Sequence, residues 1–236
     1  PLTDVVPHEA DMKLAAIVER ELDGNARVFI YANKLGSHFP YDETYPEAEA
    51  IHHPTQTEQG GNTVTSISAS YRNAVRWSVD GYFKRQFADL DLANTALVYT
   101  SDHGQYLKPK SFTHCVSDGA AAQMALVPLY AYAADAGAME KLRAGAAKSR
   151  NRASHFQIAP TVIGWMGYPE AELLKHYGES LTAGTEFAPA FTMGDIFGLF
   201  SPEARWMEVD LSRNYRDADG SIEDMQSVAN LKEARQ

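Results

Sequence analysis

The chain has 236 residues, of which 44% are hydrophobic and 22% are charged, a composition typical of a globular protein with one large or two small domains. Its longest apolar runs, such as residues 125–134, fall well short of the roughly 20 residues that a membrane-spanning helix needs, so we expect a soluble chain. The 31 acidic residues outnumber the 21 basic ones, and the formal net charge is -10. This balance argues against nucleic acid as the main partner, because binding to phosphates requires a basic face.

The first residue and the only cysteine carry limited information. Cys115 cannot form an internal disulfide, and it leaves the redox compartment undecided. The chain starts at Pro1, with no basic segment followed by an apolar one. We therefore expect that any signal or anchor has been removed or lies outside this segment, and that the chain is a fragment of a longer protein.

The first third of the chain predicts a helix, a strand and a long loop. Residues 9–22 carry apolar side chains near helical spacing and are followed by Asp-Gly-Asn, which is typical of a helix end. Residues 27–32 (RVFIYA) are short and apolar almost throughout, which predicts a strand covered on both faces. Residues 33–69 are polar and contain several prolines and glycines, and a loop of this length usually carries function or is partly disordered.

The middle of the chain continues this alternation. Apolar residues recur at offsets of three and four over 71–90, which predicts a long amphipathic helix. Residues 95–100 (TALVYT) and 125–132 (ALVPLYAY) read as two further strands, and Pro128 suggests an edge or a bulge in the second. Strand, helix and strand in this order predict an α/β fold with a parallel sheet, whose ligands bind beyond the carboxyl ends of the strands.

The last third predicts shorter elements. A helix is expected over 154–166, with a serine as its N-cap and a glycine after its end, and a short helix over 169–177. Residues 191–200 and 205–211 are interpreted as strands, and the tail that follows is charged and weakly periodic.

The most informative local pattern is Ser101-Asp102-His103-Gly104, which follows the expected strand 95–100 directly. Adjacent aspartate and histidine at a strand end can place a carboxylate oxygen and an imidazole nitrogen on one divalent metal, and Gly104 lets the backbone turn there. Zinc suits these ligands. The alternative is a turn in which Asp102 caps a helix and His103 lies in solvent.

Two further histidines are candidates for the same site. His38 lies on the loop that leaves the expected strand 27–32, and His114 follows His103 closely enough for its loop to fold back over the same cleft. Taken singly, each of these histidines is better interpreted as an ordinary polar loop residue, and it is their shared placement that favours a site. Arg72 and Arg76 lie four residues apart on the expected helix, where they either hold phosphate or belong to a solvated helix face. The remaining histidines lack a companion carboxylate at a strand end, and we interpret them as structural: His52, His53, His155 and His176.

Several motifs in the same order resemble those of a known family. They are TSDHG at 100–104, GSH with a following Pro-Tyr at 36–41, a Tyr-x-Asn-Ala-Val segment at 71–75, and Ser-x-x-x-Ile-Ala-Pro-Thr at 154–161. Together they resemble the sulfatase-like branch of the alkaline phosphatase superfamily, over about residues 9–168. The greatest similarity is to bacterial phosphoethanolamine transferases. The resemblance implies an alkaline-phosphatase-like α/β fold, with a mostly parallel sheet that is flanked by helices and incomplete at the N-terminal side.

The resemblance also implies roles for four residues. Asp102 and His103 match zinc ligands of the family, and His38 and His114 match histidines that line the substrate site. The family's threonine nucleophile and a further acidic ligand would lie upstream of Pro1, so we expect the isolated chain to be inactive. The chain departs from the family pattern at Phe39, which stands where glycine is common, and after Gly104, where Glu-Ser is common. We expect the C-terminal part of a sulfatase-like catalytic domain over 1–177 and a C-terminal extension of uncertain structure over 178–236.

The expected activity of the longer protein is transfer of a phosphoryl group through a phospho-threonine intermediate. Resemblance implies a phospholipid donor, a lipid A or glycan acceptor, a membrane anchor, and a location at the periplasmic face of the bacterial inner membrane. A homo-oligomer is plausible, because missing strands would leave a sheet edge uncovered. Two alternatives stay open. One is a sulfatase, phosphodiesterase or phosphoglycerol transferase of the same superfamily, and the other is a non-catalytic binding or scaffold domain.

Overall fold

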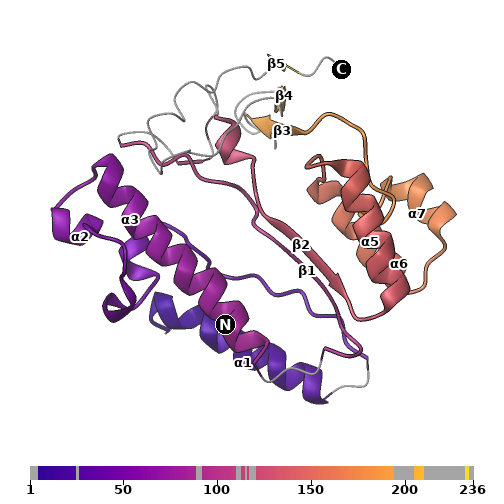
Figure 1. Ribbon diagram of the computed structural model, residues 1–236, viewed down its shortest axis with the longest axis horizontal. Coiled ribbons are helices and arrows are strands. Elements are labelled where there is room, and N and C mark those ends of the chain that lie inside the picture. Colours follow the sequence, from indigo (N-terminus) through magenta and orange to yellow (C-terminus); the bar gives the residue numbers. More distant parts are fainter. Residues whose placement is uncertain are drawn as a thin grey trace. The chain divides into compact units, whose positions relative to one another are not determined.

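The computed structural model describes residues 5–24, 27–88, 92–109, 113–114, 116, 121–193, 205–209 and 232–233. The chain divides into two compact units (Figure 1). Unit 1 comprises residues 1–91, 107–111 and 218–224, and unit 2 comprises residues 92–106, 112–217 and 225–236. Cys115 lies outside the described residues. No helix in the described ranges combines the length and the apolar character that crossing a bilayer requires.

Unit 1 is built from helices, and the longest one changes type along its length. The helix expected over 71–90 begins earlier, as α3 (Val64–Val75), continues as the π-helical segment η3 (Arg76–Gly81), and ends as α4 (Tyr82–Gln86). The helix expected over 9–22 is confirmed as α1 (Pro7–Gly24), which packs against α4 and η3. The indole N–H of Trp77 in η3 donates to the carbonyl of His8 over 2.7 Å.

Short helical turns occupy much of the predicted loop 33–69: η1 (Tyr41–Glu43), η2 (Glu47–Glu49) and α2 (Gln56–Gln59). Capping explains where α2 and α3 start. Thr55 and Glu58 form a reciprocal capping box at α2, and Thr63 and Ser66 form another at α3. These pairs satisfy backbone N–H groups that the first turn of a helix leaves without partners. The long loop is therefore ordered by local side-chain hydrogen bonds.

The strand predicted over 27–32 does not form. The backbone there has no strand pairing, and the side chains of Val28, Phe29 and Tyr31 are exposed by 42%, 63% and 82%. The expected burial on both faces is therefore not observed. The reason is that β-branched and aromatic residues favour an extended backbone, whereas a strand also needs a hydrogen-bonding neighbour. The regular elements of unit 1 that the structure describes are all helical, so they offer no strand edge.

Unit 2 contains the two other predicted strands, β1 (Ala96–Thr100) and β2 (Leu129–Ala133). They pair antiparallel, with Val98 opposite Ala131, and not in the parallel arrangement that the alternating pattern predicts. A parallel pair needs a crossover that returns the chain to its starting end, usually through a helix. The described residues between the two strands form only the short turn η4 (Ala122–Met124), so this pair of strands does not make a βαβ unit.

Helices and a second sheet complete unit 2. One face of the strand pair packs on α5 (Ala136–Ser149), where Ala133, Leu142 and Leu181 form a buried cluster. The helices expected over 154–166 and 169–177 are confirmed as η5 (His155–Gln157) with α6 (Ile158–Trp165), and as α7 (Glu170–Tyr177). The strands expected over 191–200 and 205–211 are observed over 191–193 and 205–208, while residues 194–200 and 210–211 lie outside the described residues. They belong to an antiparallel sheet of β3 (Ala190–Met193), β4 (Arg205–Glu208) and β5 (Lys232–Glu233).

Candidate functional site

The Asp102-His103 pair lies on a tight turn that leaves β1 at its carboxyl end. The hydroxyl of Ser101 donates to the carbonyl of His103 over 2.9 Å, and the N–H of His103 donates to Oδ1 of Asp102 over 3.0 Å. The N–H of Gly104 then donates to the carbonyl of Met124 over 2.8 Å, which fixes the turn to the chain before β2. These bonds hold the two potential metal ligands on one turn.

The ring of His103 has a defined tautomer. Its Nδ1 lies 2.9 Å from the carbonyl oxygen of Gly104. A carbonyl oxygen can only accept, so Nδ1 carries the proton and Nε2 of the neutral ring carries the lone pair. A hydrogen bond of this kind commonly orients metal-binding histidines.

The carboxylate of Asp102 lies near Nε2 of His103. Oδ2 of Asp102 lies 3.7 Å from Nε2 of His103. Two ligands about 2.0–2.1 Å from a tetrahedral zinc ion are about 3.3 Å apart, so a small side-chain rotation would bring both atoms onto one ion. The side chain of Asp102 is 85% exposed and that of His103 28%, which leaves the pair accessible from solvent. The donors therefore fit a divalent metal as two of its ligands.

His114 lies directly against this pair. Its ring stacks on that of His103, with centroids 3.9 Å apart and an angle of 18° between the ring planes. Its Nδ1 lies 2.9 Å from the hydroxyl of Thr113 and 3.4 Å from the side-chain oxygen of Gln105. The structure thus brings together Asp102, His103 and His114. Across the described ranges, no group of three or more histidine, cysteine, aspartate or glutamate side chains is arranged to hold a metal ion by itself.

His38 belongs to unit 1, so its convergence with the other three residues stays a prediction. Its Nδ1 lies 2.6 Å from the carbonyl oxygen of Phe39. The preceding residues are held firmly, because the N–H groups of Leu35 and Gly36 both donate to the buried carboxylate of Asp11. The GSH motif is therefore a loop of fixed shape that projects a histidine from helical surroundings.

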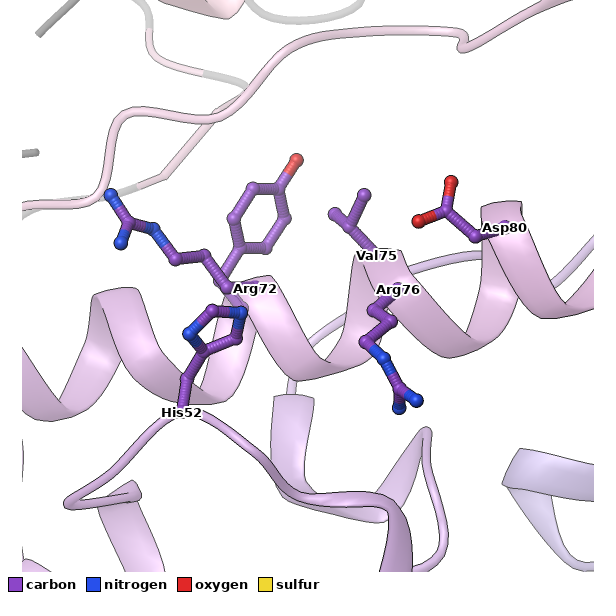
Figure 2. Close-up of a pocket in the computed structure, with 6 residues that line it drawn as sticks. His52, Arg72, Val75, Arg76 and Asp80 are labelled. Carbon is purple, nitrogen blue, oxygen red and sulfur yellow. The ribbon is translucent and has the colours of Figure 1, made fainter.

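Unit 1 also has a shallow cavity of about 310 Å³ beside its long helix (Figure 2), lined by His52, Tyr71, Arg72, Val75, Arg76 and Asp80. Burial and the charges of Arg72 and Arg76 lower the pKa of His52. Arg76 donates to the carbonyl and to the carboxylate of Glu49, each over 3.0 Å. Figure 2 shows the two guanidinium groups directed to opposite sides of the helix. They do not converge on one anion, so they form no phosphate clamp in this structure.

His155 contacts the end of β1, which the sequence patterns did not predict. Nε2 of His155 lies 3.0 Å from the hydroxyl oxygen of Thr100, and that hydroxyl donates to the carbonyl of Pro128 over 2.9 Å. Because the hydroxyl has a single proton, His155 is the donor in the first bond. His155 thus ties the last residue of β1 to the start of η5. The only sequence signal for this contact is its place next to Ser154, the residue that caps η5.

A family model described as Sulfatase matches residues 9–168. The chain belongs to the sulfatase family. The match extends from α1 to just beyond α6, and it includes the loop of His38, the pair Asp102-His103 and the stacked His114. Sulfatase-family members are enzymes with an alkaline-phosphatase-like α/β fold, and they generally use a divalent metal. A search of curated proteins and a search of solved structures found no match.

Proposed function

We propose that this sulfatase-family chain is the C-terminal part of the catalytic domain of a phosphoryl-group transferase similar to phosphoethanolamine transferases. The observation that supports the proposal is the geometry around β1, where Oδ2 of Asp102 lies 3.7 Å from Nε2 of His103 and the ring of His114 stacks on the same histidine. Carboxylate and imidazole ligands suit zinc, and a neighbouring imidazole suits proton transfer.

In this proposal each of the four residues has its own role. Asp102 and His103 would hold the zinc ion, which when bound polarises the phosphoryl group and lowers the pKa of a nucleophilic hydroxyl. His38 would bind a phosphate oxygen. His114 would protonate the leaving oxygen. The threonine nucleophile that forms a phospho-enzyme is expected upstream of this chain.

The proposed partners follow from the same similarity. They are a phospholipid donor and a lipid A or glycan acceptor, used by a membrane-anchored protein at the periplasmic face of the inner membrane. A net charge of -10 agrees with a partner other than nucleic acid. A homo-oligomer remains part of the proposal, because residues 28–31 expose apolar side chains of a strand-like segment.

Activity assays test the proposal. With added zinc, the chain alone should hydrolyse neither a phosphodiester nor a sulfate ester above the buffer rate, because the proposal places the nucleophile outside it. A longer protein that includes this chain should transfer the phosphoryl group of a phospholipid and leave the sulfate ester intact. Turnover by the chain alone would contradict the proposal that the nucleophile lies outside this chain. Sulfate-ester hydrolysis by the longer protein would establish a sulfatase instead, and inactivity on both esters would support a scaffold.

A further inference from the structure

The carboxylate of Asp11 accepts hydrogen bonds from the backbone of the loop that carries His38. Asp11 lies on α1 and is only 4% exposed. Its Oδ1 accepts the N–H of Leu35 over 2.8 Å, and its Oδ2 accepts the N–H of Gly36 over 3.0 Å. Gly36 has a φ of 65°, in the left-handed region that favours glycine. A single buried carboxylate therefore satisfies two successive backbone donors at the bend that precedes Ser37 and His38.

The positive charge of Lys34 lies beside the negative charge of Asp11. Its ammonium lies 3.3 Å from Oδ2 of Asp11, donates to the carbonyl of Ser78 over 2.5 Å, and lies 3.3 Å from the centroid of the Tyr82 ring. An ammonium has three donors and no acceptor, and these three partners match that number. Burial lowers the pKa of Lys34 to about 8, while the charge of Asp11 acts in the opposite direction. The cation is thus buried where it holds α1, the loop and the long helix to one another.

Ser78, which lies in the π-helical segment η3, also contacts this loop. Its carbonyl receives Lys34, and its hydroxyl lies 2.8 Å from the hydroxyl of Ser37. A π-helical turn changes the i→i−4 hydrogen-bonding pattern of a helix, and such segments are frequent at functional sites. Here the segment directs both polar groups of one serine at the loop. The side chain of Ser78 is almost fully buried, so these contacts are shielded from competing water.

We infer that Asp11, Lys34 and Ser78 form a positioning clamp for His38. Lys34 is part of the clamp, the next three residues, 35 to 37, are each tied to it, and His38 follows immediately. The bonds run from the helices to the loop, and a clamp that served only helix packing would not need to hold the backbone of Leu35 and Gly36. The inference rests on the proposed function, because it assigns the clamp to the residue that would bind a phosphate oxygen.

The test uses the whole chain with ¹³C-labelled histidine and follows the imidazole signal of His38 by NMR during titration with inorganic phosphate. Asp11→Asn keeps the shape of the side chain but replaces one acceptor oxygen with an NH₂ group, which faces the backbone N–H of Leu35 or Gly36. It should displace the His38 signal and weaken phosphate binding about tenfold or more, because misplacing a binding group by a fraction of an ångström is costly. Asp23→Asn is the matched control, because Asp23 is exposed on the same helix and should leave the His38 signal and the affinity unchanged.

A second variant guards against the possibility that Asp11→Asn unfolds unit 1. Ser78→Ala removes only the hydroxyl contact with Ser37 and should weaken phosphate binding about threefold, with the His53 signal unmoved. A His38 signal that is unaffected by Asp11→Asn and by Ser78→Ala in folded chains would overturn the clamp. If phosphate leaves the His38 signal of the unchanged chain in place, but Asp11→Asn still displaces it, the proposed role of His38 fails and the clamp stands.

Discussion

Gly104→Ala is expected to destabilise unit 2 by about 3 kcal/mol or more, which is at the upper end of what single substitutions do. A β-carbon at position 104 would lie 1.9 Å from the carbonyl oxygen of Gln123 and 2.7 Å from that of Leu126. Both atoms belong to the backbone, so no side-chain rotation relieves the clash. The hydrogen bond from Gly104 to Met124 requires this close approach. Alanine would therefore push the DHG turn away from the chain before β2.

Urea denaturation of the purified chain, followed by tryptophan fluorescence and circular dichroism, measures this effect. Gly61→Ala is the matched control, because a β-carbon at position 61 would meet no atom within 4 Å. It should change the free energy of unfolding by less than about 0.5 kcal/mol. If Gly104→Ala leaves the urea midpoint of unfolding unchanged, the backbone of 123–126 does not lie against Gly104.

Asp102→Asn is expected to lower phosphoryl transfer by at least about a thousandfold in a longer protein that includes this chain, because a metal site that loses a ligand holds its ion and activates its nucleophile poorly. The amide removes the negative charge and keeps the shape. The zinc content of the purified variant should fall in parallel. Glu170→Gln makes the same chemical change at an exposed position of α7 and should leave activity and zinc content unaltered. A variant at Asp102 that keeps both would exclude this residue as a ligand.

Elements defined by local signals were predictable from the sequence. The helices of α1, α6 and α7 follow from apolar spacing and from the serine cap at 154, and β1 and β2 follow from short apolar runs. The pairing of the strands was not predictable, since a run of apolar residues does not say which neighbour it will have. The segment 27–32 has a strand-like composition but no pairing, and β1 and β2 pair antiparallel. Both differences arise from long-range contacts.

In the candidate site, too, local features were predictable from the sequence and long-range contacts were not. Asp102 and His103 could be found because they are adjacent and follow a strand, and His114 because it is near in sequence. Gly104 was expected to permit a turn, whereas the structure shows that it permits a close approach to Gln123. The contacts of Asp11 with Leu35 and of His155 with Thr100 were missed because they join residues 24 and 55 positions apart. No pattern of spacing encodes such pairs.

The coordination of zinc by His103 tests the account most directly. Long-range ¹H–¹⁵N NMR of the imidazole rings resolves the two nitrogens of each histidine before and after one equivalent of zinc. We predict that Nε2 of His103 shifts to the value of a metal-bound nitrogen, that Nδ1 keeps its proton toward Gly104, and that the signal of the stacked His114 moves as well. Zinc that leaves His103 unchanged, or that binds through Nδ1, would contradict a metal site at the end of β1.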